Sequence, residues 1–251
     1  MDEKTSLKYQ MLSAWMGPLF LVGFIYSWGV MAFNLPAPPS PALSAGDLAA
    51  RYAAHLGGIR IGFLVSLIVM TLYIPWTAVL SVQMMRIGAE GRSPVLAFIQ
   101  LIGGALTVPV VSLASMFWVA AAFRPERAPE ITQALTDSGW LIIETLWACT
   151  TWQMVAAALA GLHDKNTAPL FPRWFCFVTI FCGLSFAPAT MTGILKTGPF
   201  AWDGILSFYF PYFCWLFWFG MASVYMIKEV ARRQQALGST VPAVSARLAQ
   251  A

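Results

Sequence analysis

Charged residues are scarce in this chain of 251 amino acids: Asp, Glu, Lys and Arg together make up 10% of it. Soluble domains carry roughly a quarter charged residues, which cover the surface that faces water. Hydrophobic residues make up 59% of the chain. This composition excludes an ordinary soluble enzyme and a disordered chain, and it indicates a protein that lies mainly within a lipid bilayer.

Histidine and cysteine are also rare. The two histidines, His55 and His163, fall in predicted loops on opposite sides of the membrane, which argues against bis-histidine haem and histidine-rich metal centres. The four cysteines all lie in apolar runs and form no C-x-x-C pair, so we expect buried free thiols. We therefore expect no metal and no cofactor. The cysteines are Cys149, Cys176, Cys182 and Cys214.

Several sequence motifs of catalysis and nucleotide binding are missing. There is no G-x-x-x-x-G-K-[ST], no G-x-S-x-G and no H-E-x-x-H in the sequence. The net charge is +4, but the basic residues stand at the ends of apolar runs and form no dense patch. The chain is therefore not predicted to bind ATP through a P-loop or to bind nucleic acid.

Six apolar runs are long enough to cross a membrane, since about 20 apolar residues span a bilayer as a helix. They lack the alternation of a barrel strand. The sequence predicts an all-α polytopic helix bundle, with one domain over 1–233 and a flexible cytoplasmic tail over 234–251. The predicted spans are 12–33, 59–85, 95–123, 139–162, 174–195 and 205–227.

The distribution of Lys and Arg predicts the orientation. With the N-terminus cytoplasmic, ten of the 15 basic residues fall on the inner side and five on the outer side. Both termini are therefore expected in the cytoplasm. The two larger outer segments are expected to hold short extra helices, over 45–56 with Ser44 as its N-cap, and over 128–136.

Glu144 is the first candidate for a functional residue. It lies about one turn inside the predicted span 139–162, where an ionisable side chain is costly unless it is paired or protonated. Helical spacing places Trp147 and Thr151 on the same face. The alternative is a structural ion pair between Glu144 and a basic residue of the outer rim, namely Arg60, Arg124 or Lys196.

The outer rim of the bundle is the second candidate site. Charged and titratable side chains lie at the ends of several predicted spans on this side. Together with Glu144 they could hold the anionic head group of a ligand whose apolar tail lies in the bundle. The alternative is that the cations anchor the helices at the interface and that Asp203 caps a helix. The rim residues are His55, Arg60, Arg124, Lys196 and Asp203.

Aromatic residues are abundant, with 11 Trp, 18 Phe and 7 Tyr. Four of the predicted spans also contain a proline, which interrupts helical hydrogen bonding. Deep aromatic rings beside kinked helices can form a cavity for an apolar ligand, and they are equally compatible with plain packing. The prolines are Pro75, Pro109, Pro188 and Pro211.

Four short motifs carry a family resemblance. F-P-R-W at 171–174, K-T-G-P-F-A-W-D-G at 196–204, the inner loop R-I-G-A-E-G-R-S-P and the outer loop F-R-P-E-R resemble a group of uncharacterised bacterial multi-spanning membrane proteins. The resemblance implies a bacterial inner (cytoplasmic) membrane protein and implies no particular activity.

Three functions fit these observations. The leading hypothesis is a protein that binds, or helps to move, a small hydrophobic or amphipathic molecule at Glu144. The alternatives are an accessory or scaffold subunit of a membrane complex, and a membrane enzyme that acts on a lipid or isoprenoid with Glu144 as acid or base, helped by Asp203 or His55. The expected partners are membrane lipids, a small hydrophobic ligand, and a membrane protein or a second copy of the chain.

Overall fold

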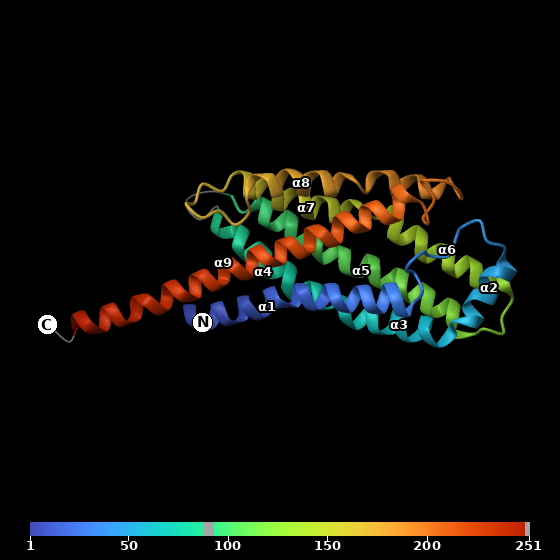
Figure 1. The fold of residues 1–251 in the computed structure, drawn as a ribbon, viewed down its shortest axis with the longest axis horizontal. Helices are drawn as coiled ribbons and strands as arrows, with labels where there is room; N and C mark the ends of the chain where they lie inside the picture. The colour runs from blue at the N-terminus through green and yellow to red at the C-terminus, as the bar shows by residue number, and fades with distance from the viewer. Residues whose placement is uncertain (88–92, 249–251) are drawn as a thin grey trace.

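The chain folds into a bundle of long helices (Figure 1). The structure, a computed structural model, describes residues 1–87 and 93–248, with side chains up to residue 239. Helices make up 79% of the chain, and no strand occurs in the described ranges. The all-α prediction is confirmed.

The helical elements follow one another with few long connections. In chain order they are α1 (Glu3–Phe24), η1 (Ile25–Met31), α2 (Ala45–Ala54), α3 (Leu56–Met70), α4 (Tyr73–Ile87), α5 (Val95–Phe123), α6 (Pro129–Thr145), α7 (Ala148–Leu162), α8 (Arg173–Leu184), η2 (Ala187–Gly193), η3 (Ile205–Tyr209) and α9 (Phe210–Leu248).

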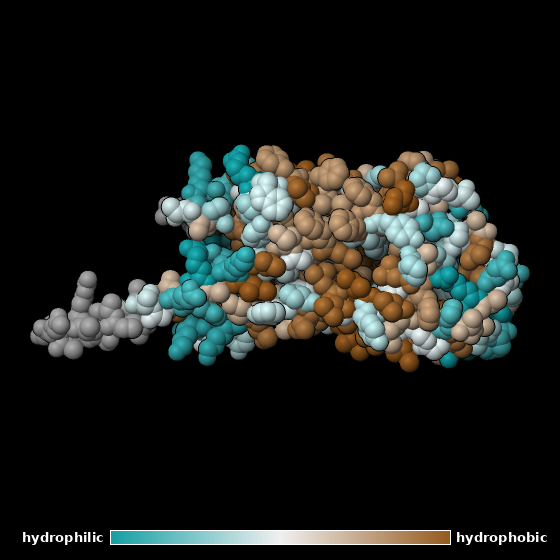
Figure 2. Space-filling model, viewed as in Figure 1, coloured by the Kyte–Doolittle hydropathy of each residue, from teal (hydrophilic) through white to brown (hydrophobic). Residues whose placement is uncertain are grey.

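Within the described ranges, five helical segments are long and apolar enough to cross a membrane, which indicates a membrane protein. Figure 2 shows a broad hydrophobic band around the middle of the bundle, between hydrophilic groups at its two ends. The five segments are Glu3–Met31, Leu56–Ile87, Val95–Phe123, Arg173–Gly193 and Ile205–Ser239.

The predicted span over 139–162 is not one continuous helix. It is divided at Leu146 and Trp147 into the end of α6 and the whole of α7, and each helix is shorter than a membrane span. The separate helix predicted over 128–136 is the first part of α6. Both α6 and α7 pack against the 29-residue helix α5, so together they run along the length of the bundle.

The prolines have different consequences. Pro75 lies just after the turn between α3 and α4, Pro188 lies in the 3₁₀ segment η2, and Pro211 follows the π-helical segment η3. The predicted interruptions are present at these three sites. Pro109, in contrast, lies inside α5, which continues without a break.

The two termini lie at the same end of the bundle, which we call the terminal end (Figure 1). Helix α9 extends beyond the other helices there and continues to Leu248. It therefore runs through most of the segment 234–251 that we expected to be a flexible tail, whose last three residues lie outside the described ranges. Most of the R-I-G-A-E-G-R-S-P loop, at 88–92, also lies outside them.

The opposite end, which we call the capped end, is covered by α2 and the proline-rich segment 34–44 (Figure 1). As predicted, Ser44 caps α2, since its Oγ accepts a hydrogen bond from the Asp47 amide (3.2 Å). The segment is tied to the bundle by the Trp202 indole, which donates to the Pro39 carbonyl (2.8 Å), and by the Tyr209 hydroxyl, which donates to the Pro36 carbonyl (3.0 Å).

Candidate functional site

A cavity surrounds Glu144, in the half of the bundle nearer the capped end. It has a volume of about 40 Å³, enough for the centres of a few water molecules but not for a benzene ring without side-chain movement. Its walls come from α1, α5, α6, α7, α9 and Phe186, which lies just before η2, and they are mostly apolar. The residues that matter most below are Phe24, Thr107, Trp147, Thr150, Tyr212 and Trp215.

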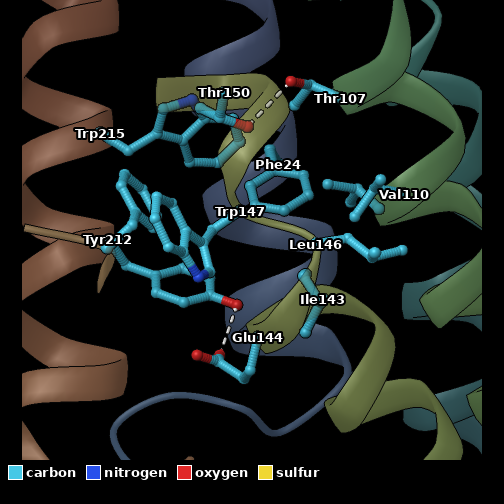
Figure 3. Close-up of a pocket in the computed structure, with 12 residues that line it drawn as sticks. Phe24, Thr107, Val110, Ile143, Glu144, Leu146, Trp147, Thr150, Tyr212 and Trp215 are labelled. Atoms are coloured by element: carbon cyan, nitrogen blue, oxygen red, sulfur yellow. Dashed lines mark hydrogen bonds between the residues drawn. The ribbon is translucent and has the colours of Figure 1, made fainter. Parts of the chain in front are cut away.

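Glu144 stands one residue before the end of α6 and is 2% exposed. The Tyr212 hydroxyl of α9 donates a hydrogen bond to its Oε1 (3.0 Å; Figure 3). No basic side chain pairs with Glu144 among the described residues: the ion pairs there are Arg232–Glu229 and Arg233–Glu3, both near the terminal end. The structural ion pair considered from the sequence is therefore wrong.

Arg60 has another role. Its Nε donates to the Ala122 carbonyl (3.0 Å) and its terminal nitrogen donates to the Phe123 carbonyl (2.9 Å). These are carbonyls of the last turn of α5, which have no partner within the helix. Arg60 therefore closes the C-terminal end of α5, where a positive charge also interacts favourably with the helix dipole.

The other rim residues do not gather around Glu144. Arg124 and Lys196 are exposed, and neither lines the cavity. His55 stacks on Phe33, with ring centroids 4.0 Å apart. Asp203 is half-buried, and the next helical segment has Gly204 as its N-cap without a side-chain bond, so the capping expected for Asp203 is absent.

Lys196 lies near a different acid. Burial raises the pKa of Asp137, on the first turns of α6, and the positive charge of Lys196 partly opposes this shift. The predicted joint site of Glu144 and the rim residues is thus corrected: Arg60 bonds the end of α5, and none of the five rim residues lines the Glu144 cavity.

The two residues predicted to share a helical face with Glu144, Trp147 and Thr151, lie in different surroundings. Trp147 lines the cavity, and its indole donates to Thr190 Oγ1 of η2 (2.8 Å). Thr151 instead donates to the Gly183 carbonyl of α8 (2.7 Å), away from the cavity. The reason is the break between α6 and α7, because helical spacing counted from Glu144 no longer holds beyond Leu146.

Thr150 takes the place in the cavity that Thr151 was expected to have. Its hydroxyl lies 2.8 Å from the hydroxyl of Thr107 on α5. Trp215 of α9 also lines the cavity, and its indole nitrogen is buried without a hydrogen-bond partner in the described part of the chain. The sequence marks these residues only as polar or aromatic positions within spans, so it could not select them.

The exposed part of the cavity wall lies at the side of the bundle. Leu146 is 50% exposed and Trp147 is half-buried, and both stand at the break between α6 and α7. The capped end, in contrast, is covered by α2 and segment 34–44. The sequence predicted a site that includes the outer rim. The cavity around Glu144 instead has its exposed wall on the side of the bundle.

A second polar group lies deeper and contrasts with the cavity. Tyr73 donates to Gln153 Oε1 (2.6 Å), and the side-chain amides of Gln153 and Gln100 both donate to Thr77 Oγ1 (3.0 and 2.7 Å). The hydroxyl of Ser81 completes the chain by donating to Gln100 Oε1. This network joins α4, α5 and α7, and all five side chains are at most 3% exposed.

Comparison with known proteins adds no identification. No protein-family profile matches the chain, and neither a curated protein nor a solved structure is significantly similar to it. The fold and the cavity therefore define the class, a helical membrane protein with a buried acidic cavity, and the function must be argued from the cavity itself.

Proposed function

We propose that the α6–α7 pair forms a sixth crossing of the membrane, with both termini cytoplasmic. An even number of crossings agrees with termini at one end of the bundle (Figure 1). The excess of Lys and Arg on the terminal side supports the orientation. The resemblance of the four sequence motifs favours the inner membrane of a bacterium.

We infer that the protein binds a small neutral hydrophobic or amphipathic molecule in the Glu144 cavity, or helps to move one through it. The observation that carries this proposal is a buried carboxyl with a single hydrogen-bond partner, Tyr212, in a cavity whose other walls are mostly aromatic and aliphatic. Buried polar groups are usually fully hydrogen-bonded. The second oxygen of Glu144 is therefore a natural place for a polar group of a ligand.

The chemistry of the cavity favours a neutral ligand. No cation lines it that could hold an anionic group. A charged carboxylate in this apolar setting would cost several kcal/mol without a counter-charge, which favours the protonated form of Glu144. A cationic ligand could pair with an ionised Glu144, but burying its charge in the apolar cavity would cost free energy.

The exposed wall suggests how such a molecule enters. A hydrophobic molecule concentrates in the bilayer, and the exposed side chain of Leu146 lies on the side of the bundle. The neighbouring Trp147 is held by one hydrogen bond, to the exposed residue Thr190. Movement of these two side chains would widen the cavity from about 40 Å³ and admit a ring-sized ligand from the lipid.

The two alternatives have different support. An accessory role is favoured by the part of α9 that extends beyond the bundle, where a partner subunit could dock. The enzyme hypothesis has less support, because neither Asp203 nor His55 lines the cavity as a second acid or base. Ligand binding therefore remains the leading proposal.

The test is native mass spectrometry of the protein released from lipid nanodiscs. We expect the wild-type protein to retain a neutral molecule, and Glu144→Leu to reduce the retained fraction about fivefold, because loss of one neutral hydrogen bond costs about 1 kcal/mol. Glu144→Gln should keep the molecule, because its amide accepts and donates as a protonated carboxyl does. Trp147→Ala should reduce it further by removing one wall.

Matched controls are available on the same helices. Glu130→Gln removes an exposed acid of α6, and Trp152→Ala removes an indole of α7 that is 61% exposed. Both should retain the molecule as the wild type does. An empty wild-type protein, or equal retention in Glu144→Leu and in these two controls, would contradict the proposal.

A further inference from the structure

The cavity has a polar pair at each end. In Figure 3, Tyr212 and Glu144 lie at one end, and the hydroxyls of Thr107 and Thr150 lie at the other. The rings of Phe24 and Trp147 and the side chain of Leu146 lie between them. The cavity therefore has two separate hydrogen-bonding positions with apolar side chains between them. A ligand with a single polar group would use only one of the two.

The direction of the hydrogen bonds at the threonine end can be assigned. Thr107 donates to the Gly103 carbonyl (2.9 Å), which uses its only hydroxyl proton. Thr150 must then be the donor in the pair with Thr107 (2.8 Å). The lone pairs of Thr150 remain free, so this end of the cavity accepts a hydrogen bond from a ligand. The ring of Trp215, with its unpartnered indole, lies beside this pair (Figure 3).

The acidic end can both donate and accept. The Tyr212 hydroxyl donates its hydrogen bond to Glu144 Oε1, and its phenolic oxygen can still accept one. A protonated Glu144 donates from its second oxygen, Oε2, which has no partner among the described residues. A hydroxyl group, which donates and accepts, satisfies both ends, whereas a carbonyl group satisfies only the acidic end.

We propose that the ligand has a rigid, flat apolar body with a hydroxyl group at each end, one for Glu144 and Tyr212 and the other for Thr150. This inference rests on the proposed function, which requires only that the cavity binds a neutral molecule. It adds the second contact, at Thr150, and the requirement that the ligand donates a hydrogen bond there.

Three probes of one shape separate the contributions: 2,6-dihydroxynaphthalene, 2-naphthol and naphthalene. Their dissociation constants are measured by equilibrium dialysis against protein in nanodiscs, with empty nanodiscs of the same lipid as the blank. The diol should bind about tenfold more tightly than 2-naphthol, because one net hydrogen bond is worth about 1.4 kcal/mol. Naphthalene should bind more weakly than both.

Adjacent residues of α7 provide the matched variants. Thr150→Val removes the hydroxyl at the cavity end, whereas Thr151→Val removes one that is bonded to Gly183 outside the cavity. We expect Thr150→Val to bring the diol and 2-naphthol to equal affinity. Thr151→Val should preserve the tenfold difference, and near-UV circular dichroism verifies that both variants fold.

The outcomes distinguish the two proposals. If 2-naphthol binds in a Glu144-dependent way and the diol gains nothing, or if Thr150→Val leaves the gain intact, the two-ended ligand is overturned while the proposed function stands. If Glu144→Leu weakens the binding of no probe, or if no probe binds, the proposed function is overturned together with the two-ended ligand.

Discussion

The membrane-embedded core contains two groups of buried polar side chains with opposite properties. In the network from Tyr73 to Ser81, each side chain is buried and bonds to another member. At Glu144, a carboxyl and a few hydroxyls stand around a cavity, and the indole of Trp215 has no partner in the described part of the chain.

This difference separates a structural role from a binding role. A fully satisfied network joins helices and fixes their register, as polar side chains commonly do within membranes. Incomplete hydrogen bonding beside free space is costly for the protein alone and is relieved when a ligand or water supplies the missing partner. Substitutions in the two groups should therefore have different effects.

The largest effect on stability is expected for Gln153→Leu. The substitution keeps the volume but leaves the Tyr73 hydroxyl without its acceptor and removes one of the two hydrogen bonds that Thr77 accepts, the other being from Gln100. We expect the free energy of unfolding to fall by about 2–4 kcal/mol, since stranding the Tyr73 hydroxyl costs about 1–3 kcal/mol and the lost bond to Thr77 about 1 kcal/mol more. Unfolding in mixed micelles, followed by near-UV circular dichroism, measures it. A loss below about 0.5 kcal/mol would remove the structural role, given that single interhelical bonds average about 0.6 kcal/mol.

Glu144 should behave differently on the same measurement. Glu144→Gln retains an acceptor for Tyr212, so we expect a change in unfolding free energy of less than about 1 kcal/mol. Glu144→Leu strands the buried Tyr212 hydroxyl and should cost about 1–3 kcal/mol. If the Gln variant were as unstable as the Leu variant, Glu144 would belong with the structural network.

Arg60 offers an intermediate case outside both groups. Arg60→Met removes two hydrogen bonds to the last carbonyls of α5, at Ala122 and Phe123. We expect a loss of about 1 kcal/mol in unfolding free energy, typical of a helix-end interaction, and unchanged ligand retention. If this variant retained less ligand than the wild type, Arg60 would have to be counted as part of the binding site.

Asp137 should give the smallest effect, and one that depends on pH. Because burial raises its pKa above the ordinary value of 3.8, the ionised form is disfavoured in the folded state. Its contribution to stability is complete below that value and is lost as pH rises through the raised pKa. Asp137→Asn should therefore melt at a higher temperature than the wild type at pH 7, and at the same temperature near pH 3. An equal difference at both pH values would contradict this assignment.

The sequence predicts much of this fold for clear physical reasons. Long apolar runs can only satisfy their backbone groups as helices in a bilayer, and Ser44 followed by Asp47 marks a helix start that the structure contains. Prolines indicate three of the interruptions. Glu144 stands out in sequence because an acid in an apolar run requires an explanation.

The rest depends on tertiary packing. The break at Leu146 and Trp147 has no glycine or proline to signal it, yet it decides that Thr150 and not Thr151 enters the cavity. The partner of Glu144 is Tyr212, which lies 68 positions away and is one of many aromatic residues in α9. Arg60 was equally visible in sequence, but its partners are backbone carbonyls that no residue pattern identifies.

The most direct test of this account compares thermal unfolding of the Gln153→Leu and Glu144→Gln variants in nanodiscs, with and without 2,6-dihydroxynaphthalene. A ligand raises the melting temperature only of a protein that binds it in the folded state. We predict that both Gln153→Leu and a Glu144→Leu variant measured beside it melt at a lower temperature than the wild type, but that Gln153→Leu keeps the increase caused by the ligand and Glu144→Leu loses it. Glu144→Gln should melt near the wild-type temperature and keep the increase, because its amide replaces the protonated carboxyl. The reverse pattern would contradict the separation of the two polar groups into structure and binding.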